Sequence, residues 1–291
     1  MPHRKLISFA WAMKKLLRSK ANFEILEGFL SELLKNNIHI LEILESESNK
    51  EDKQNKLNRV DLKVRNQENE IIIIEVQYER EFDYLQRILF GTSKVITEHI
   101  RESDPYSEIV KVISINILYF DLGQGEDYVY HGSTSFKGLH KQDLLALSEE
   151  QQELYKKDKI YQIFPEYYLI KVNNFNNIAR DTLDEWIYFL KNEEIKEDFN
   201  AKGLKKAKQE LDILKLPDHE RLAYERYQDD LHYQASMVES SYTIGVKKGV
   251  KQGEKQKAVE IAKSLLDILD SKTIAIKTGL TEKEIEILRE K

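Results

Sequence analysis

The sequence predicts an α/β protein with a mixed central sheet flanked by helices, followed by a helical C-terminal region. Three observations lead to this fold class. From residue 23 onward, hydrophobic periodicity gives the order helix, strand, strand, strand, helix, strand. Residues 59–77 hold two β-prone runs around a short polar stretch, which is typical of a hairpin. From residue 181 the pattern is mostly helical.

Two amphipathic helices are predicted first. Apolar residues recur at three-to-four spacing in residues 9–17 and 21–36, as in helices with one buried face. Residues 38–44, IHILEIL, are β-prone, and residues 45–58 are polar with almost no large apolar side chains. We expect a short strand followed by a surface loop.

The predicted hairpin is RVDLKVRNQENEIIIIEVQ, with its turn in NQENE. If the turn centres on Glu68, antiparallel pairing places Asp61 directly opposite Glu75. Directly opposed residues point to the same face of a sheet, with Cβ atoms about 4.5–5.5 Å apart. Two carboxylates are therefore expected to converge.

The remaining elements follow the same signals. Residues 81–100 have helical periodicity, and residues 109–120 are a strongly apolar candidate for a buried strand. Further strands are expected in residues 128–136 and 164–173. The helical patterns that follow cover residues 181–192, 202–214 and 219–238.

The composition changes near residue 240, where we predict a domain boundary. Residues 1–240 would form the main domain with a helical extension, and residues 241–291 a Gly/Lys-rich linker with a small helical tail. Gly245, Gly249 and Gly253 recur every four residues among lysines. They would either line one face of a helix or form a flexible hinge.

The last segment, residues 258–291, predicts helix, helix, turn, helix. Ala275, Gly279 and Ile285 are spaced as in a helix-turn-helix. The final helical segment, EKEIEILREK, has four glutamates against two lysines and one arginine. That charge is unfavourable in a DNA groove, so we favour a protein-interaction role, with a homodimer through this tail as the expected partner.

Facing carboxylates require a physical explanation. A buried carboxylate is costly unless it is paired, hydrogen-bonded or bound to a metal, and two that face each other repel. Mg²⁺ prefers hard oxygen ligands and is typically held by one or two carboxylates together with water and phosphate oxygens. Asp61 and Glu75 are therefore predicted to form a metal pair, with Gln77 on the face of Glu75.

These residues also carry a resemblance to a family. The segments ANFEILEGFLSELL, NRVDLKV, IIIIEVQ and YLQRILFGTSK resemble the Rpn family of recombination-promoting nucleases and transposases, a branch of the PD-(D/E)XK nuclease superfamily. The resemblance continues through DTLDEWIYFLKN to the glycine-lysine tail. It implies a restriction-endonuclease-like core.

The resemblance also implies an activity. A protein of this kind would be a Mg²⁺-dependent endonuclease, with Mn²⁺ as a substitute, that hydrolyses phosphodiester bonds of double-stranded DNA in recombination or transposition. Asp61 and Glu75 would bind the metal, and Glu27 would orient a water or a ligand. Glu24, one helical turn earlier, is the alternative to Glu27.

One position departs from the superfamily pattern. Gln77 stands where a lysine is usual, and an amide can position water or phosphate but carries no charge. Lys63, on the face of Asp61, is one candidate replacement for that charge. Arg87 and Lys94 lie seven residues apart on one predicted helix face, where they would contact substrate phosphates.

Composition narrows the remaining possibilities. The chain has no cysteine, which excludes disulfides, thiolate nucleophiles and Cys-ligated metal sites and suits a reducing cytoplasm. No export signal and no apolar run long enough for a membrane span are recognised, so a cytoplasmic protein without membrane contact is expected. His131 and His140 flank a predicted loop and are expected at the surface.

The net charge of −6 argues against a uniformly basic nucleic-acid binder but permits a locally basic groove. Together with the missing lysine, it motivates a second hypothesis: a weak or inactive nuclease fold that binds DNA or protein.

Overall fold

The computed structural model describes residues 6–44 and 61–290, which form two compact units. The first unit comprises residues 1–224 and the second residues 225–291. The loop predicted for residues 45–58 lies outside the described residues. The domain boundary predicted near residue 240 falls on the C-terminal side of the division between the units, and it stays a prediction.

The first unit contains a six-stranded mixed sheet with the strand order β1-β2-β3-β4-β6-β5. β3, β4 and β6 are parallel neighbours, whereas β1, β2 and β5 pair antiparallel with theirs. The mixed sheet confirms the predicted fold class. The strands are β1 (Ile40–Ile43), β2 (Leu62–Asn66), β3 (Ile71–Gln77), β4 (Val112–Leu118), β5 (Val129–Gly132) and β6 (Glu166–Lys171).

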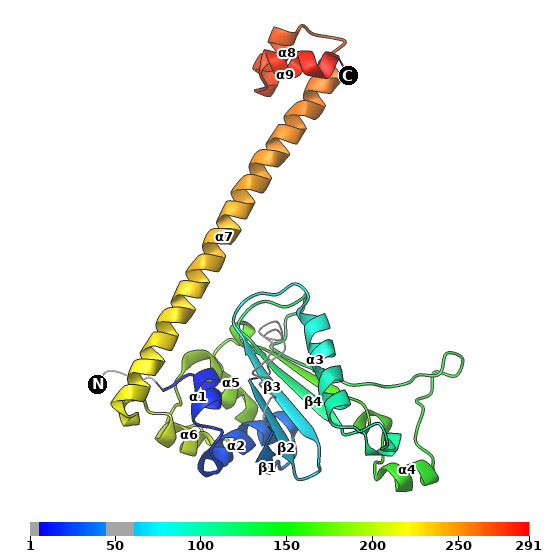
Figure 1. Ribbon diagram of the computed structural model, residues 1–291, viewed down its shortest axis with the longest axis vertical. Coiled ribbons are helices and arrows are strands. Elements are labelled where there is room, and N and C mark those ends of the chain that lie inside the picture. The colour runs from blue at the N-terminus through cyan, green and yellow to red at the C-terminus, as the bar shows by residue number, and fades with distance from the viewer. Residues whose placement is uncertain (1–5, 45–60, 291) are drawn as a thin grey trace. The chain divides into compact units, whose positions relative to one another are not determined.

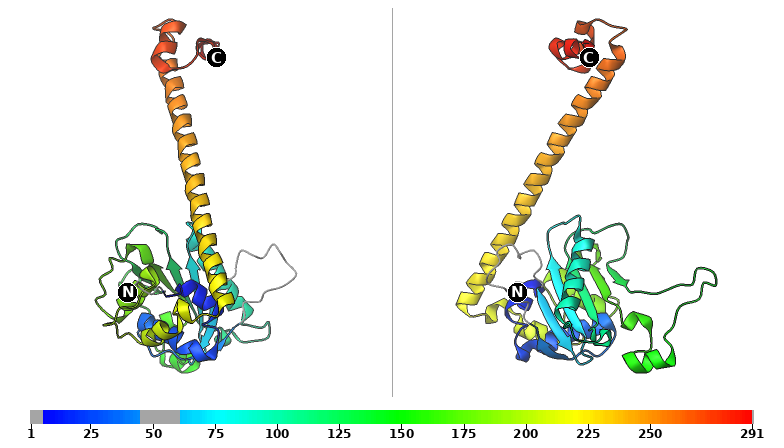
Figure 2. Two further views of the ribbon diagram at one scale, coloured as in Figure 1. Left: turned by 90° about the vertical axis from the view of Figure 1, so that its left-hand side faces the viewer. Right: turned by 45° about the vertical axis from the view of Figure 1, so that its right-hand side comes forward.

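Helices cover both faces of this sheet (Figures 1 and 2). On one face α3 packs its Val95 against Ile71 and Ile73 of β3. Ile72, between these two isoleucines on β3, is also fully buried. Its side chain points to the opposite face of the sheet, because successive side chains of a strand alternate between the two faces. The helices of the first unit are α1 (Phe9–Lys15), α2 (Phe23–Leu34), α3 (Tyr84–Glu98), α4 (Glu149–Tyr155), α5 (Thr182–Asn192) and α6 (Leu204–Glu210).

An aromatic cluster joins the N-terminal helices to α5. The ring of Phe9 on α1 lies 5.2 Å from that of Phe29 on α2 and 6.0 Å from that of Trp186 on α5. All three side chains are almost completely buried, and each large ring removes an extensive apolar surface from water. This packing fixes α1 beside the sheet.

The helix α7 (Asp218–Leu265) begins in the first unit and ends in the second. Its first turns are held within the first unit, because the Tyr224 hydroxyl accepts a hydrogen bond of 3.0 Å from the Ser8 amide. The helix continues through Gly245, Gly249 and Gly253, so the structure shows the helical alternative for that segment.

The second unit has a small core of its own. Ala262 of α7 packs with Ile274 of α8 (Ser271–Thr278) and Ile285 of α9 (Glu282–Arg289), and Figure 2 shows both short helices beside the end of α7. Gly279 ends α8 with a φ of 75°, and Thr281 caps α9. The predicted helix, helix, turn, helix order is confirmed.

Elsewhere, the predicted order from α2 to β4 is confirmed element by element. α4 was not predicted. None of the helices in the described ranges is both long and apolar enough to cross a lipid bilayer.

Candidate active site

The β2–β3 hairpin brings Asp61 and Glu75 together. Leu62 pairs with Ile74, so one further step in the same register sets Asp61, directly before β2, opposite Glu75. This is the register predicted from a turn centred on Glu68. The predicted hairpin register is therefore confirmed, whereas the roles of Asp61 and Glu75 stay predictions.

The turn explains why this register forms. The Asn66 side-chain oxygen accepts hydrogen bonds from the amides of Glu68 (3.0 Å) and Glu70 (2.9 Å), and the Asn66 amide donates to the Glu70 carbonyl (3.0 Å). Asn69 adopts a φ of 59°, a conformation that asparagine tolerates well. A turn fixed in this way determines which residues of β2 and β3 pair, from the turn to the open end of the hairpin.

Asp61 is held by three contacts from different parts of the chain. Its Oδ2 accepts a hydrogen bond of 2.8 Å from the Val76 amide on the neighbouring strand. Its Oδ1 lies 3.1 Å from the Lys14 ammonium, and its carbonyl accepts a hydrogen bond of 2.9 Å from Arg18. The Asp61 side chain is 15% exposed, so it lies at the edge of the protein rather than in the core.

Glu75 lies on β3, the strand between β2 and β4. The Tyr84 hydroxyl is 3.4 Å from Glu75 Oε2 and 3.1 Å from the side-chain oxygen of Asn116, the residue paired with Glu75 on β4. Arg87 Nη2 lies 3.8 Å from Glu75 Oε1. Burial raises the pKa of the Glu75 carboxyl; the charge of Arg87 opposes this shift and the charge of Asp61 adds to it.

Gln77 continues the same face toward the end of β3. Its amide nitrogen donates to Glu81 Oε1 at 2.8 Å and, more weakly, to the Glu79 carbonyl at 3.3 Å. Arg87 donates to the same Glu81 oxygen at 2.6 Å. Glu81 thus joins Gln77 to Arg87, while the Arg87 Nε is buried without a hydrogen-bond partner among the described residues.

The structure does not bring Glu27 to the two acids. Glu27 Oε1 accepts a hydrogen bond of 2.8 Å from the Ile40 amide, and Oε2 lies 3.8 Å from His39 Nδ1. Ile40 pairs with Asn66, which is the end of β2 opposite to Asp61. Here Glu27 anchors the start of β1, and its predicted role toward a metal remains a prediction that these contacts do not support.

Three other predicted residues also lie apart from the pair. Glu24 is exposed on α2. Lys63 is buried and directs its ammonium to Glu98 Oε2, 3.5 Å away at the far end of α3. Lys94, half exposed, also pairs with Glu98, at 3.7 Å. Of the predicted phosphate contacts, Arg87 therefore belongs to the site and Lys94 lies two turns further along α3.

Sequence reasoning missed Lys14, Tyr84 and Asn116. Lys14 was unpredictable because the packing of α1 that brings it to Asp61 joins distant segments. Asn116 did leave a signal, because it is a polar residue in a strand whose seven residues are all buried. A buried amide needs hydrogen-bond partners, which here are Tyr84 and Ser114.

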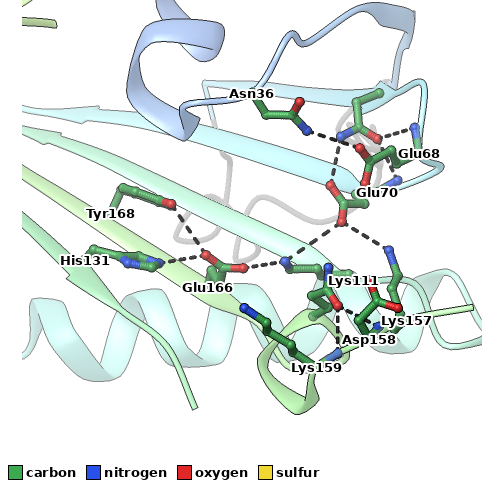
Figure 3. Close-up of polar contacts among 12 residues, drawn as sticks. Asn36, Glu68, Glu70, Lys111, His131, Lys157, Asp158, Lys159, Glu166 and Tyr168 are labelled. Atoms are coloured by element: carbon green, nitrogen blue, oxygen red, sulfur yellow. Dashed lines mark hydrogen bonds and ion pairs between the residues drawn. The ribbon is translucent and has the colours of Figure 1, made fainter. Parts of the chain in front are cut away.

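A second polar cluster lies at the opposite end of the same sheet (Figure 3). Glu166 at the start of β6 accepts from the Lys111 ammonium, from His131 Nε2 at 2.7 Å and from the Tyr168 hydroxyl at 3.5 Å. Lys111 also lies 3.9 Å from Glu70. His131, expected only as a surface residue, belongs to β5 and is part of this cluster.

The cluster borders a cavity of about 410 Å³. Each buried charge in it has an opposite charge within reach, which is the arrangement that makes burial of charge tolerable. We therefore assign it a structural role.

The donor set of Asp61 and Glu75 fits a divalent cation. Both offer hard carboxylate oxygens, and the charge of Asp61 adds to the effect of burial in raising the pKa of Glu75. Asp61 Oδ2 accepts a hydrogen bond from a backbone amide, whereas Oδ1 lies beside the half-exposed Lys14 ammonium. Within the described ranges, no group of three or more His, Cys, Asp and Glu side chains is placed to hold an ion.

The first unit is thus an α/β protein with a mixed sheet, helices on both faces and two acids at the open end of a hairpin. By sequence, the chain belongs to the PD-(D/E)XK nuclease family transposases, whose family model matches residues 9–241. The predicted resemblance to this superfamily is thereby confirmed. Curated proteins and solved structures gave no match.

Family membership supports a function related to nucleases or transposases, with DNA as the substrate class. PD-(D/E)XK nucleases generally use divalent metal ions.

Proposed function

We propose that this protein is a Mg²⁺-dependent endonuclease that hydrolyses phosphodiester bonds of double-stranded DNA in recombination or transposition. The observation that carries the proposal is the opposition of Asp61 and Glu75 at the open end of the hairpin. Two close acids, one of them buried enough to have a raised pKa, form a site that a cation would stabilise. The cytoplasm, whose reducing conditions suit a chain without cysteine, is the proposed compartment.

Asp61 and Glu75 would hold the metal, with Mn²⁺ as a substitute for Mg²⁺. When bound, the ion would neutralise phosphate charge, activate water and stabilise the leaving oxygen. The protein groups around it have separate tasks. Tyr84 and Arg87 keep the Glu75 carboxylate in place, and Gln77 positions a water molecule or a phosphate oxygen through its amide.

Arg87 also supplies the first contact to the DNA backbone. Its guanidinium is 26% exposed, and an arginine can bind a phosphate through two parallel hydrogen bonds. Lys94 would contact a phosphate further along α3, because its side chain is 43% exposed and its ion pair with Glu98 is long.

A plasmid-nicking assay with Mg²⁺ tests the proposal. We expect the wild-type chain to cut and Asp61→Ala to cut at least about 100-fold more slowly, because charge stabilisation by a metal contributes several kcal/mol. Glu42→Ala is the matched control, since Glu42 is an exposed acid on β1 of the same sheet. Equal cutting by wild type and Asp61→Ala would refute the site assignment.

A second candidate function is DNA or protein binding without cleavage. It is favoured by one observation, the presence of Gln77 where a lysine is usual, with its amide nitrogen already bonded to Glu81. Under this alternative the wild-type chain would shift DNA in a gel with Mg²⁺ present but leave the plasmid intact.

A further inference from the structure

Lys14 reaches the candidate active site from a distant part of the chain. α1 buries Phe9, Ala12 and Met13 against the first unit, which leaves Lys14 on its outer side. From there the ammonium lies 3.1 Å from Asp61 Oδ1, the carboxylate oxygen that the Val76 amide does not use. The Lys14 side chain is 46% exposed, so its head can move without leaving a cavity.

The other cations near the hairpin have acidic partners other than Asp61. Arg87 is bound to Glu81 at 2.6 Å and lies 3.8 Å from Glu75. Lys63 points to Glu98. Among the ion pairs of the described residues, Lys14 is the lysine that contacts Asp61, directly before the strand that pairs with the one carrying Gln77.

We propose that Lys14 is a catalytic residue that supplies the positive charge missing at Gln77. This proposal rests on the proposed nuclease function. Without metal, the ammonium neutralises Asp61. With a divalent ion held by Asp61 and Glu75, the flexible four-carbon side chain would be free to turn to the scissile phosphate and would stabilise the charge that develops there.

The reaction itself is a hydrolysis. A water oxygen forms a bond to phosphorus while the bond from phosphorus to the leaving oxygen breaks. One proton of the water passes to solvent, and the leaving oxygen takes up a proton from solvent. Lys14 keeps its proton in this step, and its ammonium acts only through its positive charge.

Kinetics of DNA nicking provide the first test. We expect Lys14→Ala to lower kcat about 100-fold with little change in KM, because the charge acts on the transition state. Lys14→Arg, which keeps the positive charge, should cut faster than Lys14→Ala but more slowly than the wild type. Adding Gln77→Lys to Lys14→Ala should restore part of the rate as well, by returning a lysine to the strand. Lys15→Ala, at the exposed neighbouring position on α1, should cut like the wild type.

Calorimetry of Mn²⁺ binding without DNA, on the wild type and Lys14→Ala, distinguishes a catalytic role of Lys14 from a purely structural one. Removing a cation from Asp61 should strengthen Mn²⁺ binding several-fold, since like charges no longer repel. If Lys14 had only a structural role, Lys14→Ala would disorder the site and would therefore bind Mn²⁺ more weakly than the wild type.

Three results would overturn the proposal: weaker or unchanged Mn²⁺ binding by Lys14→Ala, a change confined to KM, or unchanged cutting. Unchanged cutting by Lys14→Ala, with Asp61→Ala inactive, would remove the role of Lys14 and leave the nuclease function standing. A wild-type chain that cuts no DNA would remove both.

Discussion

Glu75 is the residue at which folding and the proposed function conflict most. Its carboxylate is 13% exposed, and the nearby charge of Asp61 adds to the effect of burial on its pKa. Arg87 and Tyr84 relieve the conflict only in part, since their contacts are 3.8 Å and 3.4 Å long. A carboxylate in this position serves a bound cation better than it serves the stability of the metal-free protein.

Glu75→Gln is therefore expected to stabilise the metal-free protein at neutral pH and to abolish DNA cutting. Because the pKa of Glu75 is raised in the folded state, its favourable contribution is present at low pH and is lost as the pH rises through the folded value. Thermal unfolding in EDTA between about pH 5 and about pH 8 measures this. The variant should melt higher than wild type, most clearly at the upper end of the range.

The control for this prediction is Glu42→Gln, an exposed acid whose change should leave the pH dependence as it is in the wild type. A Glu75→Gln protein that melts below the wild type at neutral pH would contradict the electrostatic account.

At the scale of elements, the approach of α2 to the start of α6 depends on two glycines. A Cβ added at Gly28 would lie 2.2 Å from the Lys202 carbonyl oxygen and 2.8 Å from the Gly203 Cα. Gly203 has a φ of 84°, which disfavours any side chain. The same Lys202 carbonyl accepts a hydrogen bond of 3.1 Å from the buried Trp186 indole.

Gly28→Ala should destabilise the protein by about 1–3 kcal/mol, because the backbone at Lys202 must shift and the bond to Trp186 with it. Gly91→Ala on α3 is the matched control, since nothing lies within 4 Å of its added Cβ. It should stabilise by about 0.5–1 kcal/mol, as expected when a helical glycine becomes alanine. Urea unfolding compares the two, and equal effects would contradict the close contact.

The elements that were predictable from sequence are those set by local signals. The hairpin register followed from the polar turn between two β-prone runs, and it placed Asp61 opposite Glu75. Contacts between distant segments were not predictable. Glu27 lies in a predicted helix, yet only the path of β1 shows that its carboxylate accepts a hydrogen bond from the Ile40 amide. The contact of Lys14 with Asp61 was likewise not predictable, because it depends on how α1 packs against the rest of the first unit.

At the scale of the whole molecule, the chain combines a sheet-containing unit with a small helical unit that has its own core. The acidic last helix and the exposed apolar residues of α7, among them Tyr242 and Val250, are consistent with the proposed homodimer through the tail. The sheet and both acids of the candidate site belong to the first unit.

Removal of residues 241–291 should therefore convert a dimer to a monomer, as measured by light scattering. The melting temperature of the sheet-containing unit should stay within about 2 °C of that of the full chain, and plasmid nicking should persist. An unchanged mass would exclude the tail as the dimer interface. If the truncated protein became a monomer and also lost nicking, activity would instead depend on dimer formation.

The hydrogen bond from the Val76 amide to Asp61 has a practical consequence. It joins the residue directly before β2 to the C-terminal part of β3, so replacing Asp61 frees a backbone donor as well as removing an acid. A non-cutting version of the protein, for use as a DNA-binding reagent or for trapping a DNA complex in crystals, should keep Asp61 and carry glutamine at position 75 instead.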